Sequence, residues 1–339
     1  MRPIIIYSWN NLWDSNRKRN FSSSLKFKSI SKKNNTENNA LYILNNSEKS
    51  YLINNILLKK EIDLDIDFYK SKFESTNYQN VTRFFPSISL TASYPMINHK
   101  TKNSILFQPI TQLLYTIDDN NTKKIKNEDS LETELLSSNL FTKNKYSGDD
   151  RKEHGFRINY GIKLKSNRTE GNSYSFLLGR SYYEKKQDHF MVSNGFREHH
   201  SDFVGNFSMY FSDDKELYYD FRASDNMDLN KNRIRTNFEI QNNKIDINYL
   251  QIKNFASRGN SDTEQISYGL QRKILSNWSF SFSQHRDLAG ASFSTPFKST
   301  MGIIFENDCS LIVFNVTRDK SYDIDIPSTT NYNFKVNLF

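Results

Sequence analysis

The chain has 339 residues and a formal net charge of +8, with 36% hydrophobic and 14% aromatic residues. Its mean hydropathy is strongly polar at -0.73. Disordered chains are poor in aromatic residues, so the composition argues against disorder. No apolar run approaches the roughly 20 residues of a membrane-spanning helix. The combination is typical of a transmembrane β-barrel, in which alternate residues face lipid, the lumen is polar and aromatic girdles mark both interfaces.

The basic charge fits nucleic acid, an anionic membrane surface or lipopolysaccharide phosphates as a partner. Lysine and asparagine crowd the expected turns, as at Lys32–Asn35, where solvation alone explains them. No nucleic-acid-binding motif is present, and no basic stripe follows an expected helix. Nucleic acid is therefore not an expected partner.

Short segments of alternating apolar and polar residues run along the chain, separated by polar turns. The strands expected before residue 120 are 2–9, 19–31, two weak strands around 41–44 and 51–58, then 62–68, 83–94 and 104–118. The later ones are 154–166, 173–184, 200–212, 215–225, 232–242, 244–254, 264–274, 277–287, 297–307, 310–319 and 329–338. Strands of about ten residues suit a tilted bilayer crossing, whereas strands of soluble sheets average five or six. The pattern predicts an all-β fold with about 16 to 18 antiparallel strands of a transmembrane β-barrel, as one region over residues 1–339.

The segment from Ile62 to Phe68 has the cleanest alternation in the chain. Its acidic row is Asp63, Asp65 and Asp67, and its apolar row is Ile62, Leu64, Ile66 and Phe68. We expect the apolar row to face lipid and the aspartates to face a polar lumen. Further polar candidates for the lumen are Arg157, Lys163, Arg233 and Arg235. An antiparallel sheet with one solvated face would show the same alternation, so that alternative stays open.

The stretch from Asn127 to Lys165 interrupts the alternation for roughly thirty residues, which is long for a loop in a compact sheet protein. Such a loop is either functional or disordered. It contains several acidic residues, but clustered acids in a loop are usually solvated, so a glycosidase-like pair is only a formal option.

Known catalytic motifs are absent from the chain, which has no G-x-S-x-G, Walker loop, H-E-x-x-H or C-x-x-C. His199 and His200 are adjacent, and neighbouring residues of a strand point to opposite faces. We therefore expect no enzyme activity, no metal site and no cofactor.

Five segments of the chain carry motifs in a fixed order. They are RFFPSISLTASY (Arg83–Tyr94), FQPITQLLY (Phe107–Tyr115), the block Asn127–Arg151, SFLLGRSYY (Ser175–Tyr183) and FENDCSLIVFNVTRD (Phe305–Asp319). The block contains N-x-D-S, N-L-F and Y-S-G-x-D-R, and its motif residues are Asn139, Leu140, Phe141, Tyr146, Ser147, Gly148, Asp150 and Arg151. Together the segments resemble the LptD family of lipopolysaccharide-assembly proteins, also called organic solvent tolerance proteins. Gln108 replaces the family's usual acid and Arg180 its usual glutamine.

The resemblance implies that the chain is part of an outer-membrane barrel of about 26 strands in a Gram-negative bacterium. It implies lipopolysaccharide as the substrate, an LptE-like plug lipoprotein, and a periplasmic bridge protein that docks on an N-terminal domain. Nothing in this chain resembles that domain or roughly the first third of the barrel. The N-terminal residues also lack the apolar region and cleavage site of a secretory signal. We therefore expect a fragment: the C-terminal barrel region of the family.

The last segment resembles the strand that closes the family's seam and is read by the barrel-assembly machinery. Its aromatic and apolar residues are Tyr332, Phe334, Val336, Leu338 and the terminal Phe339. An ordinary edge strand ending in phenylalanine is the alternative. We expect the sheet to stay open or strained, because strand tilt and shear belong to a larger circumference.

Cys309 is the single cysteine of the chain, so no internal disulfide framework exists. By resemblance, it occupies a position from which family members form a disulfide bond to a cysteine near the N-terminus. That partner is absent here, and a small buried residue at a strand start is the other interpretation.

Two other functions remain open at this point. A porin-like passive channel of 16 to 18 strands would be a complete barrel. A basic soluble β-protein that binds nucleic acid would instead need an internal apolar core.

Overall fold

The computed structural model describes residues 5–10, 19–32, 36–72, 78–100, 103–117, 120–168, 172–186, 190, 194–196, 199–212, 215–253, 262–289, 297–320 and 328–338. These residues form two compact units. Unit 1 comprises Met1–Met96, Phe107–Lys163 and Gly179–Asp202, and unit 2 comprises Ile97–Leu106, Leu164–Leu178 and Phe203–Phe339.

The fold is all-β, as the alternation predicts, with eighteen strands assigned to one sheet and two short strands to another. The strands before residue 120 are β1 (Ile5–Asn10), β2 (Arg19–Lys32), β3 (Thr36–Ile53), β4 (Ile56–Lys72), β5 (Gln79–Ser93), β6 (Met96–Lys100) and β7 (Asn103–Thr116). The short pair is β8 (Leu131–Glu132) and β9 (Tyr146–Ser147). The later strands are β10 (Gly155–Arg168), β11 (Ser173–Tyr183), β12 (Phe203–Ser212), β13 (Lys215–Ala223), β14 (Leu229–Ile240), β15 (Asn243–Ile252), β16 (Thr263–Leu275), β17 (Trp278–Asp287), β18 (Lys298–Asn307), β19 (Ser310–Asp319) and β20 (Thr329–Leu338).

Two short 3₁₀ helices, η1 (Asn120–Lys124) and η2 (Ser137–Asn139), lie between β7 and β10. No helix within the described ranges is long and apolar enough to cross a membrane.

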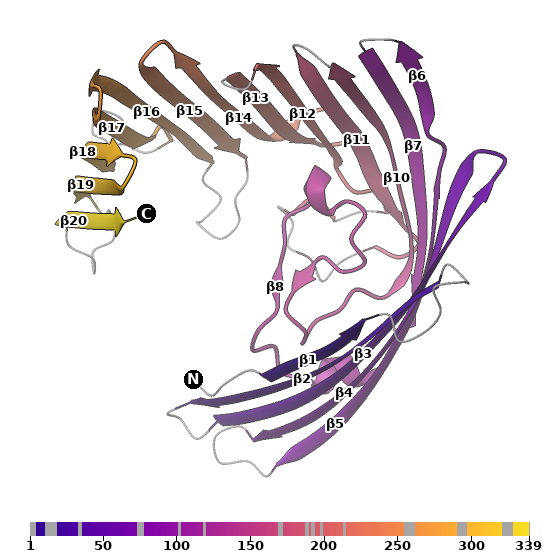
Figure 1. Cartoon of the computed structure of the whole chain (residues 1–339). Coiled ribbons are helices and arrows are strands. Elements are labelled where there is room, and N and C mark those ends of the chain that lie inside the picture. Colours follow the sequence, from indigo (N-terminus) through magenta and orange to yellow (C-terminus); the bar gives the residue numbers. More distant parts are fainter. Residues whose placement is uncertain are drawn as a thin grey trace. The chain divides into compact units, whose positions relative to one another are not determined.

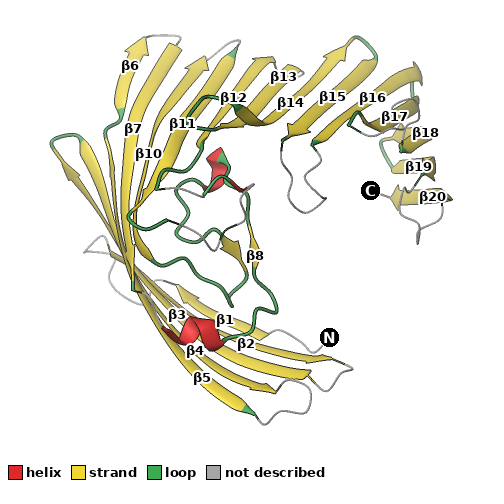
Figure 2. Ribbon diagram, turned by 180° about the vertical axis from the view of Figure 1, so that it is seen from behind, coloured by secondary structure: helices red, strands yellow, loops and turns green. Residues whose placement is uncertain are grey.

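In unit 1, the strands β1 to β5 form consecutive antiparallel hairpins (Figure 1). The segment from η1 to β10 folds over one face of these strands (Figure 2). A small apolar cluster joins the two: Ala40 and Tyr42 from β3, Tyr69 from β4 and Ile125 from the segment after η1. The rings of Tyr42 and Tyr69 pack edge to face, with centroids 5.7 Å apart.

Burial along β4 alternates as the sequence pattern predicts for the strand. The odd-numbered residues Glu61, Asp67 and Tyr69 are buried, whereas Ile62 is 44% and Phe68 43% exposed. The acidic row and the apolar row therefore lie on opposite faces of the strand. That the apolar row faces lipid remains a prediction.

One predicted strand boundary is wrong. Residues 51–58 were expected to form a single strand, but Asn54 and Asn55 make a two-residue turn with φ of +47° and +68°. Asparagine tolerates this left-handed backbone, which two-residue hairpin turns favour because it matches the twist of the strands. As a result, β3 and β4 are long strands paired from Glu37↔Lys72 to Ile53↔Ile56. In addition, β6 lies outside the strands expected from the sequence.

In unit 2, β12 to β20 form a meander in which each strand pairs with the next. The last ladder runs from Ser310↔Leu338 to Asp319↔Thr329. Within their own units, β1 pairs with β2 and β20 with β19. That the sheet stays open or strained at these two edges remains a prediction.

The hairpin between β14 and β15 generates a stability prediction. Gln241 in its turn has a φ of +55°, a conformation that suits glycine and strains residues with a Cβ atom. We expect Gln241→Gly to raise the free energy of unfolding by about 0.5 to 1 kcal/mol, measured by urea titration of the refolded chain in detergent. Asn242→Gly is the control, because Asn242 has no positive φ, and it should give no gain. Equal effects of the two changes would contradict the strain argument.

Candidate functional site

The candidate site is the face of β2 to β5 that is covered by residues 120–154, here called the covering loop. All of it lies in unit 1. The loop therefore packs within that unit.

The base of the covering loop is closed by two segments that bind each other through carboxylates and backbone amides. The Asp129 carboxylate accepts hydrogen bonds from the backbone N–H groups of Asp149 (3.2 Å) and Asp150 (3.1 Å). In return, the Asp150 carboxylate accepts from the backbone N–H groups of Glu128 (2.8 Å) and Asp129 (3.1 Å). We call this arrangement the carboxylate clasp.

Neighbouring residues complete the carboxylate clasp. The Asn127 side chain accepts from the Ser130 backbone at 2.8 Å, and the Ser130 hydroxyl accepts from the Arg151 backbone at 2.9 Å. Gly148 has a φ of +86°, and a Cβ there would lie 2.6 Å from the Asp129 carbonyl oxygen. The close approach of the two segments therefore requires glycine at this position.

Two lysines of strand β2 form ion pairs with aspartates of the carboxylate clasp. The Lys28 ammonium lies 2.7 Å from Asp129, and Lys26 pairs with Asp149. Burial alone would raise the pKa of Asp129, but Lys28 and the Asp150 amide outweigh it and lower the pKa to about 2. Burial raises the pKa of Asp150 above its usual range.

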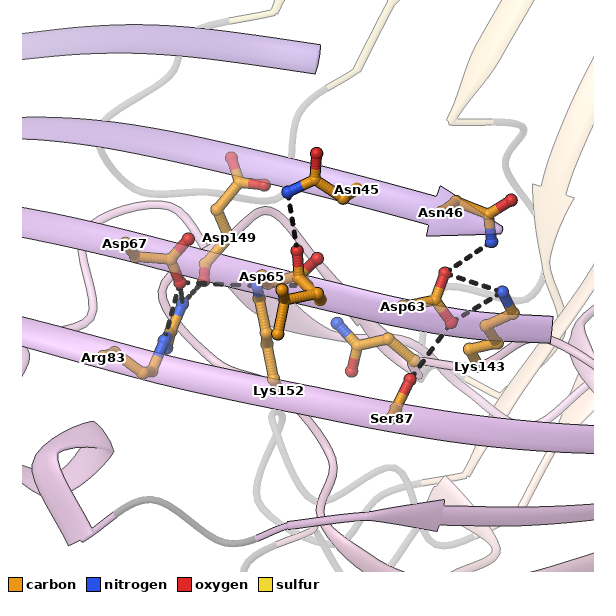
Figure 3. A network of polar contacts seen from close by, with 12 residues as sticks. Asn45, Asn46, Asp63, Asp65, Asp67, Arg83, Ser87, Lys143, Asp149 and Lys152 are labelled. Carbon is orange, nitrogen blue, oxygen red and sulfur yellow. Dashed lines mark hydrogen bonds and ion pairs between the residues drawn. The ribbon is translucent and has the colours of Figure 1, made fainter. Parts of the chain in front are cut away.

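The centre of the site is a fully buried ion pair between β4 and β5. Arg83 and Asp67 have no exposed side-chain surface, and Arg83 donates to Asp67 through Nη2 at 2.6 Å and Nε at 2.8 Å (Figure 3). Arg83 also donates to two carbonyl oxygens of the loop, those of Asp149 at 2.6 Å and Asp150 at 2.8 Å. One guanidinium thus joins two strands and the covering loop.

Two loop lysines reach other acids of β4, and Figure 3 shows Lys152 beside Asp65 and Lys143 beside Asp63. The Lys152 ammonium lies 2.6 Å from Asp65 and 3.4 Å from Asp67. Lys143 lies 3.0 Å from Glu61 and 2.8 Å from Asp63. The acidic row of β4 is therefore neutralised largely by cations that the loop supplies.

The outer part of the loop, residues 131–146, is anchored elsewhere in unit 1. The Asn139 amide bonds the backbone of Leu136 and Glu134, which shapes the turn around η2. Leu140 is fully buried, and a Cβ on Gly179 would lie 2.5 Å from its Cδ2 atom. The Tyr146 ring stacks on Phe190 at a centroid distance of 5.0 Å.

A buried lysine lies inside this outer part. Lys145 has no exposed surface, and its ammonium donates to the carbonyls of Leu140 (3.3 Å) and Thr142 (3.0 Å). Its backbone N–H donates to Glu153 at 2.7 Å, and Glu153 pairs with Arg157 at 2.5 Å. Burial, assisted by the charge of Arg157, lowers the pKa of Lys145 to about 7.

A family model described as "LptD: LPS transport system D" matches residues 7–284. The chain belongs to the LptD family. A search of solved structures found the ferric citrate transporter FecA in the unliganded form, at 8% identity and a TM-score of 0.39. That match covers 98% of this chain and 62% of the FecA chain, so this chain spans less than two thirds of that protein. Comparison with curated proteins found no match.

The motifs that carry the resemblance to the LptD family build the base and the outer turn of the loop. Residues 127–130 of N-x-D-S and residues 148–151 of Y-S-G-x-D-R form the carboxylate clasp and the contacts that complete it. Ser147 pairs with Leu131 between β8 and β9, and the Arg151 guanidinium donates to the Thr122 carbonyl at 2.9 Å. Phe141 is half-buried beside Leu140.

The structure separates the other predicted residues. Arg157 is buried and donates to the carbonyls of Thr142 and Lys143, and Lys163 is half-buried on β10. Arg233 and Arg235 lie on β14 in unit 2, where Arg233 is opposite Asp220 and Arg235 opposite Tyr218.

The C-terminal candidates lie in unit 2. Tyr332, Phe334, Val336 and Leu338 are all exposed on β20, and Phe339 lies outside the described residues. Cys309 is free and exposed in the turn before β19, which disfavours the interpretation as a small buried residue. No cluster of residues that could hold a metal occurs in the described ranges.

The basic side chains that form ion pairs with the aspartates were not predicted from the sequence. They are Lys26, Lys28, Arg83, Lys143 and Lys152. Arg83 alternates in phase with its strand and was detectable as an inward residue. The loop lysines carry no periodic signal, since loops have no fixed side-chain direction.

The Arg83–Asp67 pair gives a stability prediction. Arg83→Met leaves a buried carboxylate without its cation and removes two bonds to the loop, so we expect a loss of roughly 3–5 kcal/mol in the free energy of unfolding. Lys124→Met is the matched control, since Lys124 is exposed and its ammonium bonds the uncharged Asn121, and it should cost less than about 1 kcal/mol. Urea titration in detergent measures the free energy of unfolding of both variants. Equal losses in the two variants would show that the buried Arg83–Asp67 pair does not stabilise the fold more than an exposed lysine does.

Lys145 gives a prediction on pH. The Lys145 ammonium has a pKa of about 7 in the folded protein and about 10.4 in the unfolded chain. Between pH 7 and about 10.4, the lysine is therefore mostly neutral in the folded protein and mostly protonated in the unfolded chain. Stability of the native protein should therefore rise with pH across this window, by up to about 1.4 kcal/mol per pH unit. Lys145→Met should remove that rise, whereas Lys124→Met should retain it. Parallel curves for native protein and Lys145→Met would show that Lys145 does not titrate there.

Proposed function

We propose that this chain is the C-terminal barrel part of an LptD-like translocon that assembles lipopolysaccharide into the outer leaflet of the outer membrane. The observation that carries the proposal is the family match over residues 7–284. It is supported by the antiparallel sheet, whose long strands suit a tilted membrane crossing.

The side-chain pattern of β4 supports a membrane wall with a polar interior. Exposed apolar residues such as Ile62 and Phe68 lie on one face, and the buried acid Asp67 lies on the other. Hydrocarbon favours the first face, and only a polar, charge-compensated space accommodates the second. On this proposal, the charged face and its covering loop line the path of the lipopolysaccharide.

The proposal includes partners and excludes bond chemistry. Lipopolysaccharide is the substrate, and an LptE-like lipoprotein plugs the barrel. A periplasmic bridge protein delivers the lipid through the N-terminal domain of the family, the barrel-assembly machinery reads the last strand, and outer-membrane lipids surround the wall. The chain breaks no covalent bond, and no cofactor is required.

Site-specific cross-linking in cells tests the proposal. A photo-cross-linking amino acid replaces Asn46, whose amide bonds Asp63 on the charged face, or Phe68 on the opposite face of the sheet. We expect position 46 to capture lipopolysaccharide only while its synthesis continues, because the lipid passes in transit. Position 68 should capture membrane lipid whether or not synthesis continues.

The alternative is a porin-like passive channel in the outer membrane. It predicts no lipopolysaccharide adduct at position 46, together with ion conductance by the isolated chain in a planar bilayer. That pair of results would overturn the translocon proposal.

A further inference from the structure

The face of β3 and β4 that points away from the covering loop is here called the outer face. On β4 it carries the apolar residues of the segment Ile62–Phe68. Residues two apart on a strand share a face, so Lys60 and Lys70 continue this row beyond its two ends, and both are exposed. The apolar row is therefore bounded by a lysine on each side.

The spacing of the two lysines matches the thickness of a membrane. Lys60 and Lys70 are ten residues apart, which is about 33 Å along a strand. A strand tilt of 35–45° reduces this length to about 23–27 Å of membrane thickness, and the apolar band of outer-membrane barrels is about 25 Å tall. The lysines thus stand where hydrocarbon would give way to headgroups.

A tyrosine accompanies the basic residues at each boundary. The Lys49 ammonium lies 4.6 Å from the ring centroid of Tyr51, and the Lys70 ammonium lies 5.0 Å from that of Tyr78. Tyrosine is enriched at both interfaces of a membrane, because its ring is apolar and its hydroxyl is polar. The pattern supports the same placement of the bilayer.

At one boundary, basic residues lie directly opposite one another. Lys49 of β3 pairs with Lys60 of β4 in the ladder, and Arg19 of β2 pairs with Lys49. Like charges directly opposite each other destabilise a sheet. Within the described residues, no carboxylate forms an ion pair with Lys49 or Lys60. The fold therefore leaves this basic row without a counter-charge.

The nearest acids serve the other face. Glu48 and Glu61 each adjoin one of the two lysines in sequence and so point to the opposite side of the sheet. There they pair with Lys59, at 2.9 Å and 3.4 Å. The acids are thus engaged away from the outer face.

The Lys70 boundary differs, because it has a carboxylate of its own. Glu37 lies opposite Lys72 in the ladder and accepts a hydrogen bond from the Tyr78 hydroxyl at 2.9 Å. Of the two boundaries, the one at Lys49 and Lys60 has the greater need of an external anion.

The turn beyond the lysines indicates the leaflet that they meet. Asn54 and Asn55 form a two-residue turn at the end of the sheet where β4 pairs with Ser93 of β5. The covering loop begins on the side away from this turn, since it follows Thr116 of β7, which pairs with Ser87 of β5. Outer-membrane barrels have short periplasmic turns and longer extracellular loops. The lysine boundary therefore meets the inner leaflet.

The hairpin beyond the lysines is short and apolar. Four residues of each strand separate the lysines from the turn, roughly 10 Å of membrane thickness at the same tilt. Leu52, Ile53 and Ile56 are exposed there. Apolar side chains at this depth are covered by the region between headgroups and acyl chains.

We propose that Lys49 and Lys60 form a binding site for the phosphate group of a phospholipid in the inner leaflet of the outer membrane. Lysine binds phosphate as a point charge, and Cβ atoms of opposite residues are about 4.5–5.5 Å apart, so both ammonium groups reach one phosphate. The bound phosphate removes the repulsion between them, and the acyl chains lie along the apolar row. The proposal rests on the membrane wall of the proposed function.

The first experiment tests that wall. The full chain, in a Cys309→Ser background, is reconstituted in phosphatidylglycerol vesicles with a fluorescent label at Phe68→Cys on the outer face or at Asn46→Cys on the charged face. Lipid brominated in its acyl chains should quench the label at position 68 and not the label at position 46. Absence of quenching at position 68 would overturn the membrane wall and the phosphate site together.

The second experiment tests the phosphate site itself. Native mass spectrometry of the full chain in detergent measures the retention of phosphatidylglycerol, of diacylglycerol with the same acyl chains, and of inorganic phosphate. We expect retention of phosphatidylglycerol alone, and a roughly tenfold loss of affinity when Lys49→Gln and Lys60→Gln are combined. Equal retention of diacylglycerol would overturn the site, and so would equal retention of inorganic phosphate, since a lipid headgroup would then not be what is recognised.

Two double variants control the measurement. Lys49→Arg with Lys60→Arg keeps both cations and should retain the lipid. Lys123→Gln with Lys124→Gln removes two exposed lysines of η1, the same change of charge, and should have no effect. Equal weakening in the two glutamine variants would reveal unspecific attraction and overturn the site. Undiminished binding after the loss of Lys49 and Lys60, with quenching at position 68 intact, would overturn the phosphate site and leave the membrane wall standing.

Discussion

The buried pair between Arg83 and Asp67 is the contact on which the rest of unit 1 depends. Neither side chain is exposed to water, so each must find its partners inside the protein. Asp67 takes two of the guanidinium donors, and carbonyls of the covering loop take others. A sheet with this arginine is incomplete without its loop, which explains why about thirty residues without alternation are nevertheless ordered.

The need of Arg83 for acceptors in the covering loop also explains the structural role of the family motifs. Asp129 and Asp150 satisfy each other's backbone amides, and Gly148 allows the two segments to meet. In the sequence alone, these clustered acids are formally compatible with a catalytic pair of carboxylates. In the structure they are the geometry that presents the Asp149 and Asp150 carbonyls to Arg83. The motif is a structural one, and its residue types are explained by these contacts.

The strands could be predicted from the sequence where apolar and polar residues alternate regularly. In β4, the alternation from Ile62 to Phe68 was sufficient to assign the two faces, because side chains of a strand alternate by geometry. The turn at Asn54 and Asn55 was missed because neither residue interrupts the pattern as strongly as glycine or proline. The partners of the aspartates were beyond local reasoning altogether, since Lys143 lies 80 residues from Asp63 and Lys152 lies 87 from Asp65.

The same separations bear on how the unit assembles. The β3–β4 hairpin has a two-residue turn, so its seventeen paired positions form with little loop-closure entropy. The loop contacts close much longer segments of chain, and such contacts form late because their entropy must be lost before they stabilise. Until the loop docks, β4 carries Glu61, Asp63, Asp65 and Asp67, and the strand cations that pair with them among the described residues are Lys59 of β4 itself and Arg83 of β5. The repulsion along that row is relieved when Lys143 and Lys152 arrive, so the wall itself provides the electrostatic drive that draws the loop into place.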